Sequence, residues 1–517
     1  MLIGLIKNDS STLLLDFCNL EHTIIERMVG YSPTSCTTAR LNTVATNLLI
    51  IMSDQHTPAA YGAYGNRLAR TPHLDKLAAS GTTFDAAYCN SPICVPSRAA
   101  MATGQYVHRT GNYDNASPYL GTEAPSWGHR AESAGITATT IGKLHYRSVD
   151  DDTGFRDQRV PLHVRGGTGD LFHALRDRQP TAIQLRNAVI DVRAEESDYS
   201  TFDRTVASEA CEWLNEAATR DAPWLCKVSF VTPHYPFVVP PEYLEMYDVD
   251  SLPTPVRSSP ENWDHHPAVD IYREACGLDE PLTELQTKEA VRAYYGLVSF
   301  MDAQVGRVLD ALRDSGQEQD TLVLYLSDHG ELLGTDGLWF KGTMGEMSVR
   351  IPMILSGPGV PTGQCHTPVS LVDVYPTVVD ALDLPPAESD DSLPGRSLLQ
   401  TCLAPTDPDR IAFSEYHSAN SHSGLFMIRL RHWKYIYCVG FPEQLFDLDA
   451  DPTESNNLAS SHPEVTSECR TALFDICDPI QVDTEVREAQ QRRVADYGGI
   501  DKVLEKPLMA YSPTSGS

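Results

Sequence analysis

The feature that most constrains the fold of this 517-residue chain is a series of short apolar runs, each about as long as one β-strand. The runs are continuous rather than alternating, which is typical of strands buried on both faces of a sheet. Helical stretches separate them, so the pattern predicts an α/β fold with a mostly parallel sheet covered by helices on both faces. The five runs are Leu48–Met52, Ala138–Ile141, Leu225–Val231, Leu322–Leu326 and Ile351–Leu355.

Three segments have the pattern of helices. Arg204–Thr219 carries apolar residues at helical spacing. Thr283–Ser315 begins with a capping box formed by Thr283 and Gln286 and ends before a glycine, which predicts a long helix with defined ends. The charged segment Val482–Val494, near the end of the chain, is also predicted to be helical.

The C-terminal part of the chain has a different pattern. Leu384–Gly395 is rich in proline, serine and aspartate, which is typical of a linker. Beyond it, apolar and polar residues alternate, and this predicts a small antiparallel sheet. The predicted strands of that sheet are Ile411–Tyr416, Leu425–Tyr437 and Gln444–Leu448.

A chain of 517 residues is too long for a single ordinary core, so we expect one large domain and a smaller one. The C-terminal helix and tail could serve assembly into a homo-oligomer. The predicted parts are an N-terminal extension (1–43), a catalytic domain (44–383), a linker (384–400), an antiparallel subdomain (401–480) and a C-terminal helix and tail (481–517).

Charge and composition restrict the partners and the compartment. Forty basic and 70 acidic residues give a net charge of −30, which argues against nucleic acids and anionic membranes as partners. The apolar stretches Met1–Ile6 and Leu13–Phe17 are too short and too close to acidic residues for a convincing signal peptide. The 12 cysteines show no metal-ligand spacing. We therefore expect a cytoplasmic protein, although Cys89 and Cys94 are close enough in sequence to raise the question of a disulfide.

Polar groups follow almost every predicted buried strand. In open α/β sheets, ligands bind outside the carboxyl ends of the strands. Each of these residues alone could as well cap a turn or form a structural ion pair, but together they predict one crevice rich in carboxylates, imidazoles and an ammonium group. They are Asp54, Gln55 and His56 after the first run, Lys143 and His145 after the second, His234 after the third, and Asp328 and His329 after the fourth.

The sharpest motif is Cys94-Val95-Pro96-Ser97-Arg98, which is followed by a run of small residues and Thr103-Gly104. With this C-x-P-x-R pattern the chain resembles the type I, formylglycine-dependent sulfatases of the alkaline phosphatase superfamily. The resemblance extends over about residues 45–460, because the polar residues above and Lys341 occur in the order of that family. It implies an alkaline-phosphatase-like α/β/α sandwich and a sulfuric ester hydrolase that acts on small sulfate esters.

The resemblance also implies a modified nucleophile and a metal. In the family, a maturation enzyme oxidises the cysteine to formylglycine, whose hydrate attacks sulfur and later re-forms the aldehyde, and Arg98 would stabilise that hydrate. Typical arylsulfatases carry aspartate and asparagine where this chain has Gln55 and His329. Because a nitrogen ligand shifts preference from Ca²⁺ toward Mn²⁺, the expected cofactor is one divalent ion, Ca²⁺ or Mn²⁺. The implied ligands are Asp54, Gln55, Cys94, Asp328 and His329.

Further residues match the family's sulfate-binding and proton-transfer positions. Lys143 and Lys341 would neutralise the sulfate oxygens, and Asn115 would contact the substrate. His234 is expected to be the general acid for the leaving oxygen, shared with Lys341, and His145 the base.

Within the family, the strings YCNSPICVPSR, GKLHY and SDHGELLGTDGLWFK resemble the choline-sulfatase-like branch. Tyr113, Trp127 and Trp339 are candidates for an aromatic cage around a quaternary ammonium group. Two alternatives are an arylsulfatase and a hydrolase of phosphonate monoesters or phosphodiesters, although the latter tend to carry Tyr and Thr in place of Lys143 and His145. A third is a non-catalytic anion-binding protein in which the cysteine is never converted.

Overall fold

The computed structural model describes residues 45–176, 182–506 and 514. Residues from Val44 onward form one compact unit. The predicted extension, residues 1–43, lies outside the described residues, as does most of the tail beyond residue 506. No helix within the described ranges is both long enough and apolar enough to cross a membrane.

The core of this unit is an eight-stranded sheet with the strand order β11-β2-β10-β9-β1-β7-β4-β5. The five strands from β9 to β5 run parallel to one another, whereas β10 is antiparallel to both of its neighbours. The prediction of a mostly parallel sheet is therefore confirmed. The strands are β1 (Asn47–Asp54), β2 (Gly81–Phe84), β4 (Ala138–Lys143), β5 (Asp157–Leu162), β7 (Leu225–Pro233), β9 (Thr321–Ser327), β10 (Met353–Ser356) and β11 (Gly363–Cys365).

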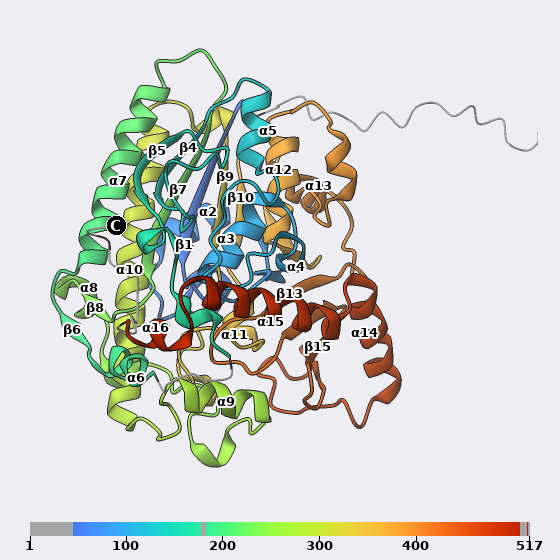
Figure 1. Cartoon of the computed structure of the whole chain (residues 1–517). Coiled ribbons are helices and arrows are strands. Elements are labelled where there is room, and N and C mark those ends of the chain that lie inside the picture. The colour runs from blue at the N-terminus through green and yellow to red at the C-terminus, as the bar shows by residue number, and fades with distance from the viewer. Residues whose placement is uncertain (1–44, 177–181, 507–513, 515–517) are drawn as a thin grey trace, which may run out of the picture. The chain divides into compact units, whose positions relative to one another are not determined.

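Helices cover both faces of the sheet, as predicted (Figure 1). Alternate side chains of β1 enter the two cores: Ile50 packs on one face and Ile51 on the other. The face that carries Ile51 is covered by α2 (Pro72–Ala79), α7 (Asp198–Ala217) and α10 (Glu284–Asp314), and the face that carries Ile50 by α3 (Cys94–Thr103), α5 (Trp127–Ser133) and α12 (Val374–Ala381).

The two long helices follow the capping chemistry of their sequences. Thr283 caps α10 in a capping box with Gln286, as predicted. The helix α7 begins earlier than the predicted start at Arg204, because Ser197 forms its own capping box with Ser200. Both helices pack on the face of the sheet that carries Ile51.

The predicted C-terminal antiparallel sheet is present and has the order β13-β14-β15-β16. The segment Leu425–Tyr437, predicted as one strand, forms two: Leu430 pairs with Trp433 across a tight turn in which Arg431 adopts a φ of 55°. An apolar run can therefore contain a hairpin when one residue accepts a left-handed conformation. The strands are β13 (Ala412–Tyr416), β14 (Leu425–Leu430), β15 (Trp433–Cys438) and β16 (Gln444–Asp447).

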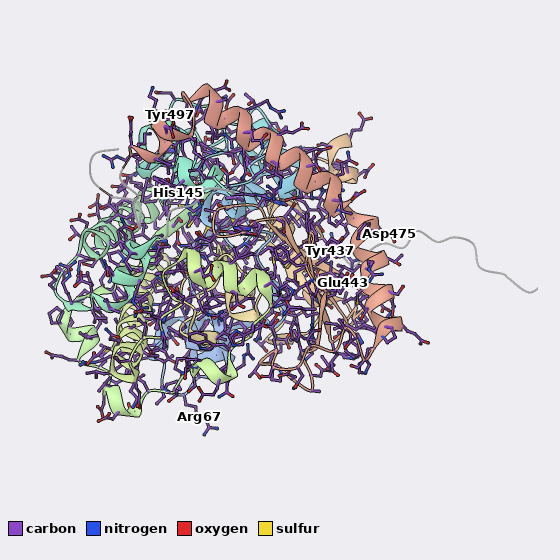
Figure 2. All side chains as sticks on the ribbon, turned by 60° about the horizontal axis from the view of Figure 1, so that its bottom comes forward. Arg67, His145, Tyr437, Glu443, Asp475 and Tyr497 are labelled. Carbon is purple, nitrogen blue, oxygen red and sulfur yellow. The ribbon has the colours of Figure 1, made fainter. Side chains whose placement is uncertain are left out.

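Two further helices follow this sheet. The helix α14 (Pro463–Ile476) packs on this sheet, and the ring centroids of Phe474 in α14 and Tyr437 in β15 lie 5.7 Å apart. Figure 2 labels Tyr437 on the sheet and Asp475 on the helix. The helix α15 (Pro479–Asp496) contains the predicted helix Val482–Val494, and the short α16 (Ile500–Leu504) follows it. Most of the predicted linker is irregular, with a short 3₁₀ helix at Glu388–Ser392.

Candidate active site

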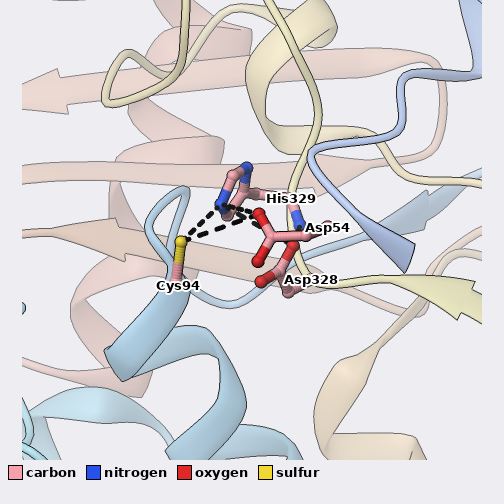
Figure 3. Close-up of side chains that lie close together, drawn as sticks. All are labelled: Asp54, Cys94, Asp328 and His329. Carbon is pink, nitrogen blue, oxygen red and sulfur yellow. Dashed lines mark hydrogen bonds and ion pairs between the residues drawn. The ribbon is translucent and has the colours of Figure 1, made fainter. Parts of the chain in front are cut away.

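The polar residues predicted to meet at the end of the sheet do so. Asp54 ends β1, Lys143 ends β4, and His234 and Asp328 follow β7 and β9 directly. The first residue of α3, Cys94, lies against Asp54 and His329, as Figure 3 shows. This convergence follows from the parallel strands, whose carboxyl ends lie at one edge of the sheet.

The Cys94 side chain is buried within this group. Its Sγ lies 3.8 Å from Asp54 Oδ1 and 3.2 Å from His329 Nε2. Cys89 and Cys94 are both free, so the disulfide that their spacing suggested is not formed. Burial and the nearby Asp54 carboxylate raise the pKa of the Cys94 thiol to about 11. An unmodified Cys94 is therefore a neutral thiol near pH 7 and a poor nucleophile.

Arg98, one turn further along α3, connects four strands. Its Nε donates to Asp328 Oδ2 at 2.8 Å and its Nη2 to Asp54 Oδ2 at 3.0 Å. Its Nη1 donates to the Lys143 carbonyl at 2.7 Å and to Ser229 Oγ at 2.9 Å. Because these partners belong to β1, β4, β7 and the end of β9, one buried guanidinium fixes the relative positions of the strand ends.

The electrostatic centre of the group is Asp54. Its Oδ2 accepts a hydrogen bond from Lys143 Nζ at 2.6 Å as well as the bond from Arg98. Burial alone would raise the pKa of Asp54, but the charges of Lys143 and Arg98 outweigh it and hold the pKa well below its usual range. Burial opposes the charge of Lys143 in turn, yet Asp54 raises the pKa of that ammonium group. Both partners therefore stay charged.

Four side chains form a cluster that could hold a metal ion: one ligand atom from each of Asp54, Cys94, Asp328 and His329 lies within 4.8 Å of the others. His329 Nδ1 lies 3.0 Å from the Gly330 carbonyl, so it carries the proton and leaves the lone pair of Nε2 facing the cluster. Burial and the charge of Lys341 lower the pKa of His329, which keeps the ring neutral. Two carboxylates and one neutral imidazole suit a divalent cation.

Gln55, the fifth predicted ligand, lies beside this cluster in a strained backbone conformation with φ of 67°. Its amide N–H donates to Asp328 Oδ1 at 3.1 Å, and its carbonyl accepts from Tyr294 Oη at 2.6 Å. Its side-chain oxygen accepts a hydrogen bond from Lys341 Nζ, and its side-chain nitrogen donates to Glu331. The backbone bonds thus hold the side chain between a cation and an anion.

Lys341 and His234 form a direct pair, with Nζ and Nε2 2.6 Å apart. His234 Nδ1 lies 2.5 Å from the Tyr235 carbonyl and donates to it, so Nε2 accepts from the ammonium group. Burial and the charge of Lys341 hold the pKa of His234 well below its usual range. His234 is therefore neutral in this pair and accepts a hydrogen bond from Lys341.

The two remaining predicted residues lie at the same edge. His145 is buried, with a φ of 61°, and burial together with the charge of Lys143 holds its pKa well below its usual range (Figure 2 labels this residue). Asn115 Oδ1 accepts a hydrogen bond from the backbone N–H of Val95 at 3.1 Å, in the first turn of α3. Asn115 thus contacts the helix that carries Cys94.

The three rings considered for an aromatic cage do not meet. Trp127 belongs to the core between the sheet and α5, where it packs on Phe155 with ring centroids 4.5 Å apart. Trp339 belongs to a different cluster, and Tyr113 packs on the edge of a third. These three candidates therefore do not form one cage, because each ring packs in a separate apolar cluster.

Sequence reasoning missed three residues that support the site. Ser229 binds Arg98, Glu331 binds the Gln55 side chain, and Asp203 accepts hydrogen bonds from the backbone N–H groups of Val231 and Thr232, just before His234. Ser229 could have been noticed as a polar residue inside an apolar strand. Glu331 could have been noticed because it follows Asp328 and His329 closely in the same loop. Asp203 carries no local signal.

The fold and the site define a hydrolase of the alkaline-phosphatase-like class. Residues 46–384 match the Sulfatase family model, and the chain belongs to this family of sulfuric ester hydrolases. It is 33% identical to a choline-sulfatase of Rhizobium meliloti (strain 1021), over 87% of this chain and 90% of that protein, and 31% identical to arylsulfatase K of Danio rerio, over 87% of each. The crystal structure of a phosphonate monoester hydrolase of Agrobacterium radiobacter has a TM-score of 0.68 and 25% identity, over 83% and 95% of the two chains. The predictions of family, fold and sulfuric ester hydrolysis are confirmed.

Proposed function

We propose that this sulfatase hydrolyses choline O-sulfate or a similarly small sulfate monoester, with Cys94 converted to formylglycine by a maturation enzyme. The observation that carries the proposal is the convergence of Asp54, Lys143, His234 and Asp328 on the buried Cys94. An unmodified Cys94, with its raised pKa, is a weak nucleophile, which is why we expect the modification. Formylglycine would supply an aldehyde hydrate as the nucleophile.

One divalent ion would be held by Asp54, Gln55, Asp328 and His329, together with the modified Cys94 side chain. When bound, it would act as a Lewis acid toward the nucleophile and the sulfate oxygens. The neutral His329 nitrogen in an otherwise oxygen-rich set favours Mn²⁺ over Ca²⁺. Arg98 would keep the two carboxylates in place, because it binds both of them.

The cations and imidazoles divide the remaining work. Lys143 and Lys341 would neutralise the terminal sulfate oxygens, and Asn115 would contact the substrate. His234 accepts a hydrogen bond from Lys341, so we propose that the leaving oxygen receives its proton from this pair. His145, which its depressed pKa keeps neutral, would accept the proton when sulfate is expelled.

The main alternative is a hydrolase of phosphonate monoesters or phosphodiesters in the same superfamily. Similarity to the phosphonate monoester hydrolase of Agrobacterium radiobacter favours it, whereas Gln55 and His329 fit this class and the choline-sulfatase-like enzymes equally. The presence of Lys143 and His145 favours sulfate instead, because hydrolases of phosphonates and phosphodiesters tend to carry Tyr and Thr at these two positions. An arylsulfatase is the second alternative, supported by arylsulfatase K of Danio rerio. A non-catalytic anion-binding protein is the remote one.

We further propose a cytoplasmic location and a homo-oligomer. The ten cysteines within the described ranges are all free, which suits a reducing compartment. The C-terminal helix α15 exposes Ile480 at its start, where a neighbouring subunit could bind. Size-exclusion chromatography with light scattering tests the assembly.

The deciding experiment measures initial rates of hydrolysis of choline O-sulfate, an aryl sulfate and a phosphonate monoester, beside a Cys94→Ala variant. We expect the highest kcat/KM for choline O-sulfate and no activity in the variant. A peptide mass measurement should find formylglycine at position 94. A faster rate on the phosphonate would overturn the sulfate assignment, and an active Cys94→Ala variant would overturn the nucleophile.

A further inference from the structure

Glu331 is a fully buried carboxylate in the loop that follows β9. Its Oε1 accepts two backbone hydrogen bonds, from Leu333 N at 2.9 Å and from Phe340 N at 2.7 Å. Its Oε2 accepts a hydrogen bond from the side-chain nitrogen of Gln55. Every partner of this carboxylate is a donor, and the two backbone bonds prevent it from turning.

The opposite end of the Gln55 side chain is its oxygen, which accepts from Lys341. A primary amide has two ends of similar shape, and only the hydrogen-bond partners decide which end points where. The ammonium group of Lys341 can only donate and therefore requires the oxygen of the Gln55 side chain, while Glu331 Oε2 accepts from its nitrogen, so the two partners select the same orientation. The oxygen then points toward Lys341.

We propose that Glu331 is a positioning residue that fixes the amide of Gln55, so that an oxygen and not a nitrogen is presented to a divalent cation held with Asp54 and Asp328. The proposal rests on the proposed metal site. It gives a physical reason why a neutral glutamine can serve beside two carboxylates, since the NH₂ end that would repel a cation is turned away and bound. The proposal also implies that substitutions of Glu331 and Gln55 affect metal binding interdependently.

The test uses isosteric exchanges of the pair. In Glu331→Gln, the backbone N–H groups of Leu333 and Phe340 still need an acceptor, so the side-chain oxygen of the new glutamine stays beside them. Its NH₂ group then faces Gln55. The side-chain amide of Gln55 must then rotate by half a turn, which directs its nitrogen instead of its oxygen toward the proposed metal site. We expect the Mn²⁺ affinity, measured by titration calorimetry on chelator-treated protein, to fall by roughly tenfold or more.

The double variant Gln55→Glu, Glu331→Gln restores the pairing, because the new carboxylate accepts from the new amide and again presents an oxygen to the cluster. We expect its Mn²⁺ affinity to recover to at least the wild-type value. The single variant Gln55→Glu places two carboxylates against each other and should bind less tightly than the double variant. A crystal structure of Glu331→Gln should show the turned amide through its contact with Lys341.

The matched control is Asp302→Asn, an isosteric change of another buried carboxylate that accepts two backbone hydrogen bonds, from His73 and Leu74. It should leave the Mn²⁺ affinity unchanged. The proposal fails if Glu331→Gln binds Mn²⁺ as the wild type does, if the double variant binds no better than the single one, or if the wild type takes up no divalent ion. Metal binding without any sulfatase activity would instead contradict the proposed function and leave this inference standing.

Discussion

At the scale of single residues, the site depends on a few buried charges that must be matched. Arg98 is fully buried and binds both Asp54 and Asp328, and Lys143 shares Asp54 with it. Charges buried in this way are stable only while each has its partners, because an unpaired one would lose its hydration without compensation. We therefore expect the same residues to be required for folding as well as for the proposed activity.

We predict that Arg98→Lys destabilises the protein although it keeps the charge. A lysine cannot bind Asp54, Asp328, the Lys143 carbonyl and Ser229 at once, because it lacks the planar fork. The free energy of unfolding should fall by roughly 3 kcal/mol in a urea denaturation experiment.

The control for this variant is Arg130→Lys, whose partner Asp390 lies at 3.0 Å near the surface. Arg130→Lys should lower the free energy of unfolding by less than about 1 kcal/mol. An equal loss in the free energy of unfolding of the two variants would contradict the role assigned to Arg98, which is to hold the strand ends together.

A second residue-scale prediction concerns pH. Burial raises the pKa of Asp302 to about 7, although hydrogen bonds from Leu74 and His73 oppose the rise. A carboxyl group with a raised folded-state pKa contributes stability that is fully present below its unfolded pKa and is lost as the pH rises through the folded pKa. An asparagine at this position would not titrate, and its NH₂ group cannot accept one of the two backbone hydrogen bonds. The free energy of unfolding of Asp302→Asn should therefore start below that of the wild type near pH 4 and rise relative to it up to about pH 7, by up to about 4 kcal/mol.

Denaturant midpoints at several pH values measure this difference. The activity at a fixed temperature serves as the control, because Asp302 contacts α2 and not the candidate site. A difference between the variant and the wild type that stays constant with pH would show that Asp302 is ionised throughout this range.

At the scale of elements, the C-terminal helix α15 reaches the candidate active site through one loop. Gln490 Nε2 donates to Asp114 Oδ2 at 2.7 Å and to the His417 carbonyl at 2.8 Å. The next residue after Asp114 is Asn115, which binds the first turn of α3. An element added at the end of the chain thus supports a loop that precedes it by more than 300 residues.

We predict that Gln490→Met loosens this loop and raises KM more than it lowers kcat, because Asn115 is expected to contact the substrate rather than the reacting atoms. Steady-state rates on the best sulfate ester measure both parameters. The double variant Asp114→Asn, Gln490→Glu exchanges donor and acceptor between these two side chains but leaves the His417 carbonyl without its donor, so it should recover only part of the lost affinity. An unchanged KM in Gln490→Met would show that the helix does not position the loop.

At the scale of the whole molecule, a net charge of −30 surrounds a buried site with several cations. A long-range negative potential repels an anionic substrate, and added salt screens that repulsion. A zwitterionic substrate such as choline O-sulfate has no net charge and is little affected. We therefore expect the charge of the molecule to favour a zwitterionic over an anionic sulfate ester during the approach to the site.

We predict that kcat/KM for an aryl sulfate rises roughly threefold between about 10 and 200 mM salt, while kcat/KM for choline O-sulfate changes little. Initial rates at constant pH measure the two dependences, and the same enzyme preparation serves for both. A fall in kcat/KM with salt for the aryl sulfate would mean that the local cations dominate the approach.

Several parts of the fold and site were readable from the sequence because they depend on local pattern. The buried strands, the Thr283 cap of α10 and the polar residues after each strand are encoded by neighbouring residues. The hairpin within Leu425–Tyr437 was not, because its single left-handed residue, Arg431, carries no glycine or asparagine signal. The separation of Trp127 and Trp339 was also invisible, since a ring's destination depends on which elements pack around it.

The sequence by itself determined the family, the α/β architecture and the set of acids, imidazoles and cations at the strand ends, because these follow from apolar periodicity and from a motif of fixed spacing. Only the tertiary structure decided which of these groups are paired. The ion pairs of Arg98 with Asp54 and Asp328 and the orientation of the Gln55 amide depend on partners more than 40 residues away. Such contacts exist only after the sheet has assembled, so no local pattern can specify them.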